Sequence, residues 1–416
     1  MSQAKALERE NTNGSPGPTV YDSAYFVELE NQYSAHNYLP LDVVLERGEG
    51  VWVYDVDGKR YLDCLSAYSA VNQGHCHPAI QQAAVEQMRH ITLTSRAFRN
   101  AEMGPFLEEL CTLTGYDKAL PMNSGAEAVE TAIKAVRKWG YRIKGVAPEQ
   151  AEVIVCEGNF HGRTTTIIGF SSNEQYRRDF GPFTPGFVTV PFGDVQALEK
   201  AITPYTVAFL VEPIQGEGGV VVPPEGYLRA AADVCARHNV LFVADEIQTG
   251  LGRTGYLFAS HHENVRPDVA ILGKALSGGF YPVSAVLTDD EVLGLFEPGD
   301  HGSTFGGNPL GAAIGRAALK VTQDEDLIRR SRELGAYFKT RVENIDSPHV
   351  DLVRGRGLFI GVVLNKPARP FCEALRDRGM LCKETHTYVI RIAPPLVITR
   401  EQIDWAVDQL ETVLLS

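Results

Sequence analysis

Apolar runs and helical patterns alternate through the middle of the chain. Four short runs are apolar at every position, at residues 153–156, 207–211, 240–244 and 269–272. Strands buried on both faces have this pattern, which is typical of a parallel sheet covered by helices on each side. The sequence therefore predicts an α/β fold with a mostly parallel sheet and helices on both faces.

The pattern changes after about residue 311. Helices are expected at residues 312–323, 326–345 and 370–379, and strands at 358–364 and 389–392. A final helix begins at Thr399 and Gln402, which are spaced as a capping box, and its apolar residues recur at helical spacing. These elements predict a second, smaller α+β domain at the C-terminus.

Near the N-terminus, Asp57-Gly58 separates two short apolar-rich runs and predicts a tight hairpin turn. The first residues are polar and rich in Ser, Pro, Gly and Asn, as in a flexible tail. We therefore expect four segments. They are a tail at 1–18, an N-terminal segment at 19–66 that packs with the small domain, a large domain at 67–310 and a small domain at 311–416.

Composition and charge narrow the possible partners. The 416 residues are 44% hydrophobic and 22% charged, with a net charge of −13. An acidic chain is a poor match for nucleic acid, whose phosphates need a basic face. We expect no membrane span and no targeting segment, and the seven unpatterned cysteines suggest a reducing compartment. A cytoplasmic protein that acts on small molecules is the resulting expectation.

Two candidate chemical groups follow the ends of predicted strands. Asp245 follows the run at 240–244, and Lys274 comes after the run at 269–272. Ligands bind at the carboxyl ends of parallel strands, where a desolvated lysine has a lowered pKa and can form an imine. Taken alone, Asp245 could cap a loop and Lys274 could extend to solvent.

Two further segments could bind a phosphate. Gly125 stands in a loop that opens a helical pattern, and helix N-termini attract anions. A glycine-rich loop at residues 301–309 could also hold a phosphate or only turn the chain. By itself, each signal is weak.

Together these stretches resemble the class III aminotransferases, which share the aspartate aminotransferase fold. The matching runs are residues 66–78, 158–164, 211–217, 244–251, 272–279, 301–304 and 390–396. The resemblance covers nearly the whole chain after the tail and implies the cofactor pyridoxal 5′-phosphate (PLP). It implies that Lys274 holds PLP through a Schiff base and that Asp245 pairs with the pyridinium nitrogen.

The resemblance also assigns the other cofactor contacts. It places Phe160 and Ile247 on the two faces of the PLP ring and Gln248 near the ring oxygen. Gly125 and Ala126 are expected to offer backbone N–H groups to the phosphate.

A further contact is expected from a second copy of the chain. The resemblance implies that Thr304 reaches the phosphate of the cofactor in the neighbouring subunit. A homodimer with shared active sites is therefore expected.

Five residues are expected to bind the substrate: Arg391, Arg163, Glu217, Tyr38 and Tyr68. By the resemblance, Arg391 and Arg163 hold the two carboxylates of 2-oxoglutarate or glutamate. Glu217 neutralises Arg391 while a diamine donor is bound, and Tyr38 with Arg163 then holds the distant carboxylate. Tyr68 is expected to line the site. Without the flanking matches, both tyrosines could be ordinary packing residues.

The expected reaction transfers the terminal amino group of ornithine to 2-oxoglutarate, giving glutamate 5-semialdehyde and glutamate. N-acetylornithine and 4-aminobutyrate are the alternative donors within the family, and Tyr38 favours ornithine. An alternative of another class is a non-catalytic protein that binds PLP as a sensor. The run His75-Cys76-His77 has no second ligand cluster at metal-site spacing, so no metal is predicted.

Overall fold

The computed structural model describes residues 21–416, so the predicted tail at 1–18 lies outside the described residues. Its central sheet has seven strands in the order β4-β10-β9-β8-β7-β5-β6. They are β4 (Lys118–Met122), β5 (Glu152–Cys156), β6 (Phe187–Val190), β7 (Thr206–Val211), β8 (Leu241–Asp245), β9 (Val269–Leu272) and β10 (Ser284–Thr288). Strands β9, β8, β7, β5 and β6 run parallel, and β10 is antiparallel to both neighbours. The predicted mostly parallel sheet is confirmed.

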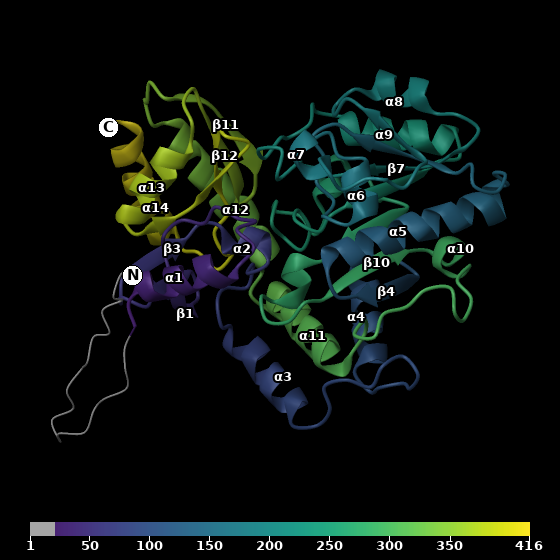
Figure 1. The fold of residues 1–416 in the computed structure, drawn as a ribbon, viewed down its shortest axis with the longest axis horizontal. Helices are drawn as coiled ribbons and strands as arrows, with labels where there is room; N and C mark the ends of the chain where they lie inside the picture. The colour runs from purple at the N-terminus through teal and green to yellow at the C-terminus, as the bar shows by residue number, and fades with distance from the viewer. Residues whose placement is uncertain (1–20) are drawn as a thin grey trace.

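Helices cover both faces of this sheet, as predicted (Figure 1). On one face, α5 (Gly125–Trp139) packs on residues such as Val243 and Ile271. On the other, α8 (Val195–Ala201) and α9 (Tyr227–Arg237) pack on Phe242 and Ala244. Neighbouring residues of one strand point to opposite faces, so a strand with helices on both sides is apolar at every position.

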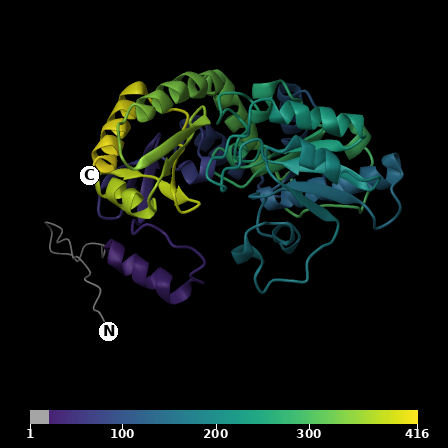
Figure 2. The same cartoon turned by 90° about the horizontal axis from the view of Figure 1, so that it is seen from above.

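The C-terminal part has a second sheet in the order β11-β12-β15-β14. Its strands are β11 (Val350–Arg356), β12 (Phe359–Leu364), β14 (Lys383–Thr385) and β15 (Val389–Ile392), and its helices are α12 (Leu327–Glu343), α13 (Arg369–Asp377) and α14 (Arg400–Leu414). Figure 2 shows the long C-terminal helices lying along one face of this sheet. The capping box at Thr399 and Gln402 is present at the start of α14. The predicted smaller α+β unit is confirmed.

The N-terminal strands form a third sheet in the order β1-β2-β3-β13. These are β1 (Leu45–Glu49), β2 (Trp52–Asp55), β3 (Arg60–Asp63) and β13 (Met380–Leu381). The predicted hairpin joins β2 to β3, with Gly58 at a positive φ of 87°. Because β13 pairs with β3, the N-terminal segment lies beside the C-terminal part (Figure 1).

The remaining elements connect these sheets. The α-helices are α1 (Ser23–Tyr33), α2 (Ser66–Ser69), α3 (Pro78–Met88), α4 (Met103–Thr114), α6 (Thr165–Gly169), α7 (Glu174–Arg177), α10 (Asp290–Leu293) and α11 (Pro309–Asp324), and the short π or 3-10 helices are η1 (Gly140–Lys144), η2 (Ala259–Glu263) and η3 (Lys274–Ser277). Helix α11 packs both against the central sheet and against the C-terminal part. The predicted domain boundary at residue 310 therefore stays a prediction. Within residues 21–416, no helix combines the length and apolar character needed to cross a membrane.

Candidate active site

The structure brings Lys274 and Asp245 to one cavity at the carboxyl ends of β9 and β8. Lys274 is the first residue of η3, and Asp245 is the last residue of β8. Both line a cavity of about 80 Å³. Burial lowers the pKa of the Lys274 amine, although the charge of Asp245 opposes this shift. The lowered pKa favours the neutral amine, which is the form that attacks a carbonyl carbon. Lys274 has a φ of 42°, which is uncommon for a residue with a Cβ atom.

Asp245 is held by a buried histidine that the sequence analysis did not single out. His161 Nδ1 lies 2.6 Å from Asp245 Oδ2, and Asp245 Oδ1 accepts a hydrogen bond from the backbone N–H of Ile247 at 3.1 Å. Burial opposes a charge on His161, but the hydrogen bond and charge of Asp245 outweigh it and raise the pKa of the imidazole. Asp245 is thus oriented on two sides beside the cavity.

Glu212 is a second residue that the sequence analysis missed. It lines the same cavity, and its Oε2 accepts the backbone N–H of Phe160 at 2.9 Å. Burial and the charge of Asp245 raise the pKa of Glu212 to about 7, although His161 opposes the shift. Both missed residues stand in matching runs, and the need of a buried Asp245 for a polar partner was the signal that could have pointed to His161.

The start of α5 forms another wall of the cavity. Ser124 and Glu127 make a reciprocal capping box there, and Gly125 and Ala126 line the cavity. The first N–H groups of a helix have no carbonyl partner within it, so they can bind an anion. A Cβ atom at Gly125 would lie 3.1 Å from Ile247 Cδ1, so glycine allows the close approach of these two walls.

The predicted ring contacts also line the cavity. Phe160, Ile247 and Gln248 are all among its lining residues. The side-chain nitrogen Nε2 of Gln248 is buried and has no hydrogen-bond partner within the described chain. A buried donor without a partner is costly, so this atom is suited to a bound polar group.

Arg391 and Glu217 form an ion pair next to Tyr68. Arg391 Nη1 lies 2.5 Å from Glu217 Oε1, and Arg391 Cζ lies 4.8 Å from the centre of the Tyr68 ring. The Arg391 side chain is 1% exposed and comes from β15, whereas Glu217 follows β7 in the large domain. The charge of Arg391 is therefore neutralised while Glu217 stays in place.

Tyr68 is presented by an unusual turn of backbone. The four residues of α2 all have positive φ, namely 50°, 46°, 60° and 74°, so this turn is left-handed. Such a conformation costs roughly 1–2 kcal/mol per residue with a side chain. Asp63 holds the start of the turn, because its Oδ1 accepts the N–H groups of Leu65 and Ser66 at 2.8 and 2.9 Å. Its Oδ2 lies 2.7 Å from His75 Nε2.

Six predicted site residues do not line the Lys274 cavity: the cluster of Tyr68, Glu217 and Arg391 just described, and three exposed residues, Tyr38, Arg163 and Thr304. Tyr38 is 71% exposed and lines a separate hollow that Tyr68 also borders. Arg163 is exposed and lies over the Tyr176 ring, with its Cζ 3.7 Å from the ring centre. Thr304 is exposed in the loop before α11. Their predicted contacts need a substrate or a second subunit.

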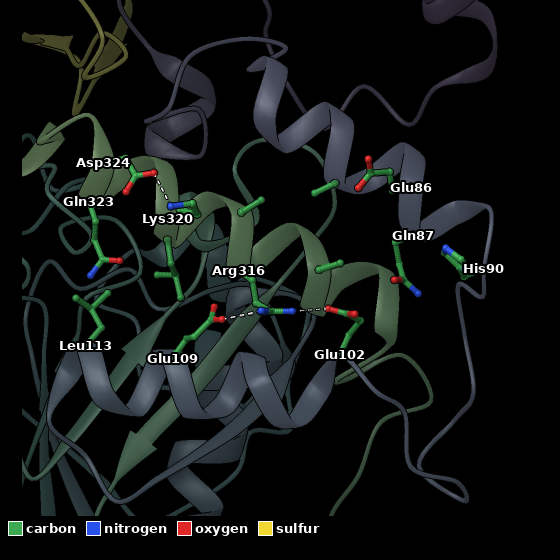
Figure 3. Close-up of a pocket in the computed structure, with 14 residues that line it drawn as sticks. Glu86, Gln87, His90, Glu102, Glu109, Leu113, Arg316, Lys320, Gln323 and Asp324 are labelled. Carbon is green, nitrogen blue, oxygen red and sulfur yellow. Dashed lines mark hydrogen bonds and ion pairs between the residues drawn. The ribbon is translucent and has the colours of Figure 1, made fainter.

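A larger hollow, of about 600 Å³, lies between α3, α4 and α11 (Figure 3). Its charged groups bind one another: Arg316 contacts Glu102 and Glu109, and Lys320 contacts Asp324. It contains no predicted site residue. Within residues 21–416, no group of three or more His, Cys, Asp or Glu side chains could hold a metal ion, and His75 and His77 instead pair with Asp63 and Glu325.

Comparison with solved structures places the fold in a class. Ornithine aminotransferase from Toxoplasma gondii, with PLP at its active site in partial occupancy, has a TM-score of 0.94 and 43% identity, and 95% of each chain is covered. Acetylornithine aminotransferase from Elizabethkingia anophelis has a TM-score of 0.87 and 50% identity, covering 95% of this chain and 99% of that one. The fold and the cavity with its strand-end lysine define a PLP-dependent aminotransferase.

Sequence comparison gives the family. The family model described as aminotransferase class-III matches residues 33–414. An ornithine aminotransferase from Brevibacillus brevis is 59% identical over 388 residues, which cover 93% of this chain and 97% of that protein. The chain belongs to the class III aminotransferases, and the predictions of family and cofactor are confirmed.

The residues of the cavity fit this cofactor. The free N–H groups at the start of α5 suit a phosphate, and Asp245 suits a protonated ring nitrogen. Lys274 supplies the amine, and the unpartnered side-chain nitrogen of Gln248 could donate a hydrogen bond to an oxygen of the cofactor.

Proposed function

We propose that this protein transfers the terminal amino group of ornithine to 2-oxoglutarate. The observation that carries the proposal is the Arg391–Glu217 ion pair beside the Lys274 cavity. A free Arg391 would bind an α-carboxylate and bring the adjacent amine to Lys274. With Glu217 in place this anchor is masked, which favours a donor whose reacting amine lies far from its carboxylate.

The cofactor contacts are assigned by the same proposal. PLP bound here supplies an electron-accepting ring that stabilises negative charge at the substrate carbon. Asp245 keeps the ring nitrogen protonated, and Phe160 and Ile247 hold the ring faces. Lys274 holds the cofactor and, once displaced by substrate, moves a proton at the reacting carbon.

The substrate residues divide between the two half-reactions. Tyr38 and Arg163 hold the carboxylate of ornithine, while Tyr68 lines the path between them and Lys274. When 2-oxoglutarate is bound, Glu217 releases Arg391, which takes the α-carboxylate, and Arg163 takes the distal one. Support for ornithine comes from the description of the Brevibacillus brevis relative.

A comparison of donors tests this function. Purified holoenzyme is assayed with ornithine, N-acetylornithine and 4-aminobutyrate, each with 2-oxoglutarate, by measuring glutamate. We expect kcat/KM to be highest for ornithine, with a semialdehyde product. A preference for N-acetylornithine would contradict the proposal and match the Elizabethkingia anophelis relative instead.

The same assay with Glu217→Gln tests the role of the ion pair. Glutamine keeps the shape but loses the charge that masks Arg391, and a charged hydrogen bond contributes about 1.5–3 kcal/mol. We expect kcat/KM for ornithine to fall roughly tenfold or more, while the reaction of 2-oxoglutarate with the aminated enzyme is largely kept. An equal fall in both half-reactions would contradict this role.

We also propose that the protein is a homodimer with shared active sites. Phe98 and Phe305 are 74% and 44% exposed, and Thr304 stands beside Phe305 outside the cavity of its own chain. A second subunit would cover these aromatic side chains and receive Thr304 at its cofactor phosphate. A cytoplasmic location is supported by the cysteines, all seven of which are described and free.

A further inference from the structure

Arg253 is a fully buried cation at the place where three parts of the chain meet. It lies in the loop between β8 and η2, and its exposed fraction is 0%. Within residues 21–416, no carboxylate lies within ion-pair distance of it, in contrast to the buried Arg391, which pairs with Glu217. Burying a cation without an ion pair costs desolvation free energy, which its hydrogen bonds must offset. Those hydrogen bonds show what Arg253 connects.

The hydrogen bonds of Arg253 join its own loop to two other stretches of the chain. Nη1 donates to the carbonyl oxygens of Leu358 and Pro394, at 2.9 and 2.6 Å, in the small domain. Nη2 donates to Asn72 Oδ1 at 2.5 Å, in the segment that follows the left-handed turn. The backbone oxygen of Arg253 accepts from Ser331 Oγ at 2.9 Å.

Both ends of this network lead to the active site. Pro394 lies three residues after Arg391, and Asn72 lies four residues after Tyr68. On the other side, the loop of Arg253 is anchored next to Asp245. Glu246 does this, because its carboxylate accepts hydrogen bonds from Thr249 Oγ1 at 2.5 Å and from the Ser260 N–H at 2.9 Å.

We propose that Arg253 is a positioning residue that fixes Arg391 and Tyr68 relative to β8, the strand that ends in Asp245. The inference rests on the proposed function, in which Arg391 binds 2-oxoglutarate but is masked by Glu217 when ornithine is bound. Loss of Arg253 therefore displaces the group that the 2-oxoglutarate half-reaction uses. The ornithine half-reaction, which relies on Tyr38 and Arg163, is affected much less.

The test measures the two half-reactions separately. Wild type, Arg253→Gln and Arg253→Lys are each reacted with ornithine alone, and their aminated forms with 2-oxoglutarate alone, by following the absorbance of the cofactor. We expect Arg253→Gln to raise the half-saturating 2-oxoglutarate concentration roughly tenfold or more, since small misplacements of binding groups have such effects. The half-saturating ornithine concentration should change about threefold at most. Arg253→Lys should raise the half-saturating 2-oxoglutarate concentration less than Arg253→Gln does.

Arg330→Gln is the matched control. Arg330 Nη2 also donates to two carbonyl oxygens, those of Val397 and Ile398 at 3.0 Å each, but all three residues belong to the C-terminal part. We expect it to lower the melting temperature without separating the two half-reactions.

Equal losses in both half-reactions of the Arg253 variants, or an unchanged 2-oxoglutarate value, would overturn the inference. Arg253→Lys keeps the charge, so it provides the answer if Arg253→Gln does not fold. If the proposed function is wrong, wild type itself will not react with ornithine or with 2-oxoglutarate. If only this inference is wrong, wild type will react with both, and the half-saturating concentrations of the Arg253 variants will not differ from it as expected.

Discussion

The buried carboxylates near the end of β8 differ in the groups that surround them. Glu246 is bonded to hydroxyl and backbone N–H groups, and Asp245 is paired with His161, whereas Glu212 accepts backbone N–H groups and has the negative Asp245 nearby. Burial raises the pKa of Glu212 to about 7, so this carboxyl gains its charge near neutral pH. A group of this kind beside the cavity makes the stability of the cofactor-free protein depend on pH.

The sign of this effect follows from the direction of the shift. The folded-state pKa lies above the unfolded value, so the contribution of Glu212 to stability is complete below the unfolded pKa and is lost as pH rises to about 7. We expect the stability of Glu212→Gln, relative to wild type, to increase between pH 5 and pH 8 by at most about 3 kcal/mol. Urea unfolding of the cofactor-free proteins measures this.

The control for this series is Glu157→Gln, which removes an exposed carboxylate that does not line the cavity. A constant difference for Glu212→Gln would show that Glu212 is ionised throughout this range.

Individual site residues differ in how far the sequence could predict them. Lys274, Asp245 and Gly125 follow or open recognisable elements, so their common location follows from the topology of a parallel sheet. Arg253 has no such local pattern, because its partners Asn72 and Pro394 are 181 and 141 residues away. The left-handed turn at α2 was also unpredictable, since residues with side chains rarely adopt it.

At the scale of elements, long apolar runs decided which strands were recognised: β10 is buried at every position, but it begins at Ser284 and ends at Thr288 and was missed. Strands β7, β8 and β9 are buried at every position and were predicted to within one residue at each end. Strands β1 and β14 were missed, because β1 is mostly exposed and β14 has three residues and is mostly half-buried. Their pairing depends on partners distant in sequence and has little local pattern.

Helix α14 allows a prediction for an element far from the chemistry. Thr399 Oγ1 accepts the N–H of Gln402 at 3.3 Å, and Gln402 Oε1 accepts the N–H of Thr399 at 2.9 Å. We expect Thr399→Ala to lower the free energy of unfolding by about 1 kcal/mol and to leave kcat and KM unchanged. Thr412→Ala, which removes a hydroxyl bonded within the same helix, is the control and should have a smaller effect. Equal effects in urea unfolding would contradict the importance of the cap.

At the scale of the whole molecule, the active site combines residues from parts that are far apart in the chain. Lys274 follows β9 of the central sheet, Arg391 lies in β15 of the C-terminal sheet, and Tyr68 lies in α2, after the N-terminal strands. Pairing of β13 with β3 and the hydrogen bonds of Arg253 join these parts within one chain. The proposed contact of Thr304 with the cofactor of a second subunit would extend the same principle to two chains.

Mixed dimers test this sharing directly. We expect Lys274→Ala and Thr304→Glu each to be nearly inactive, the first without its amine and the second with a carboxylate facing the cofactor phosphate. After unfolding and refolding of an equal mixture with PLP, half of the dimers should be heterodimers, each with one site that has both native residues. Activity should return to about a quarter of wild type, since one site in two is intact in half of the dimers. If Thr304 served its own chain, every site would carry one of the two defects, and the mixture would stay as inactive as its components.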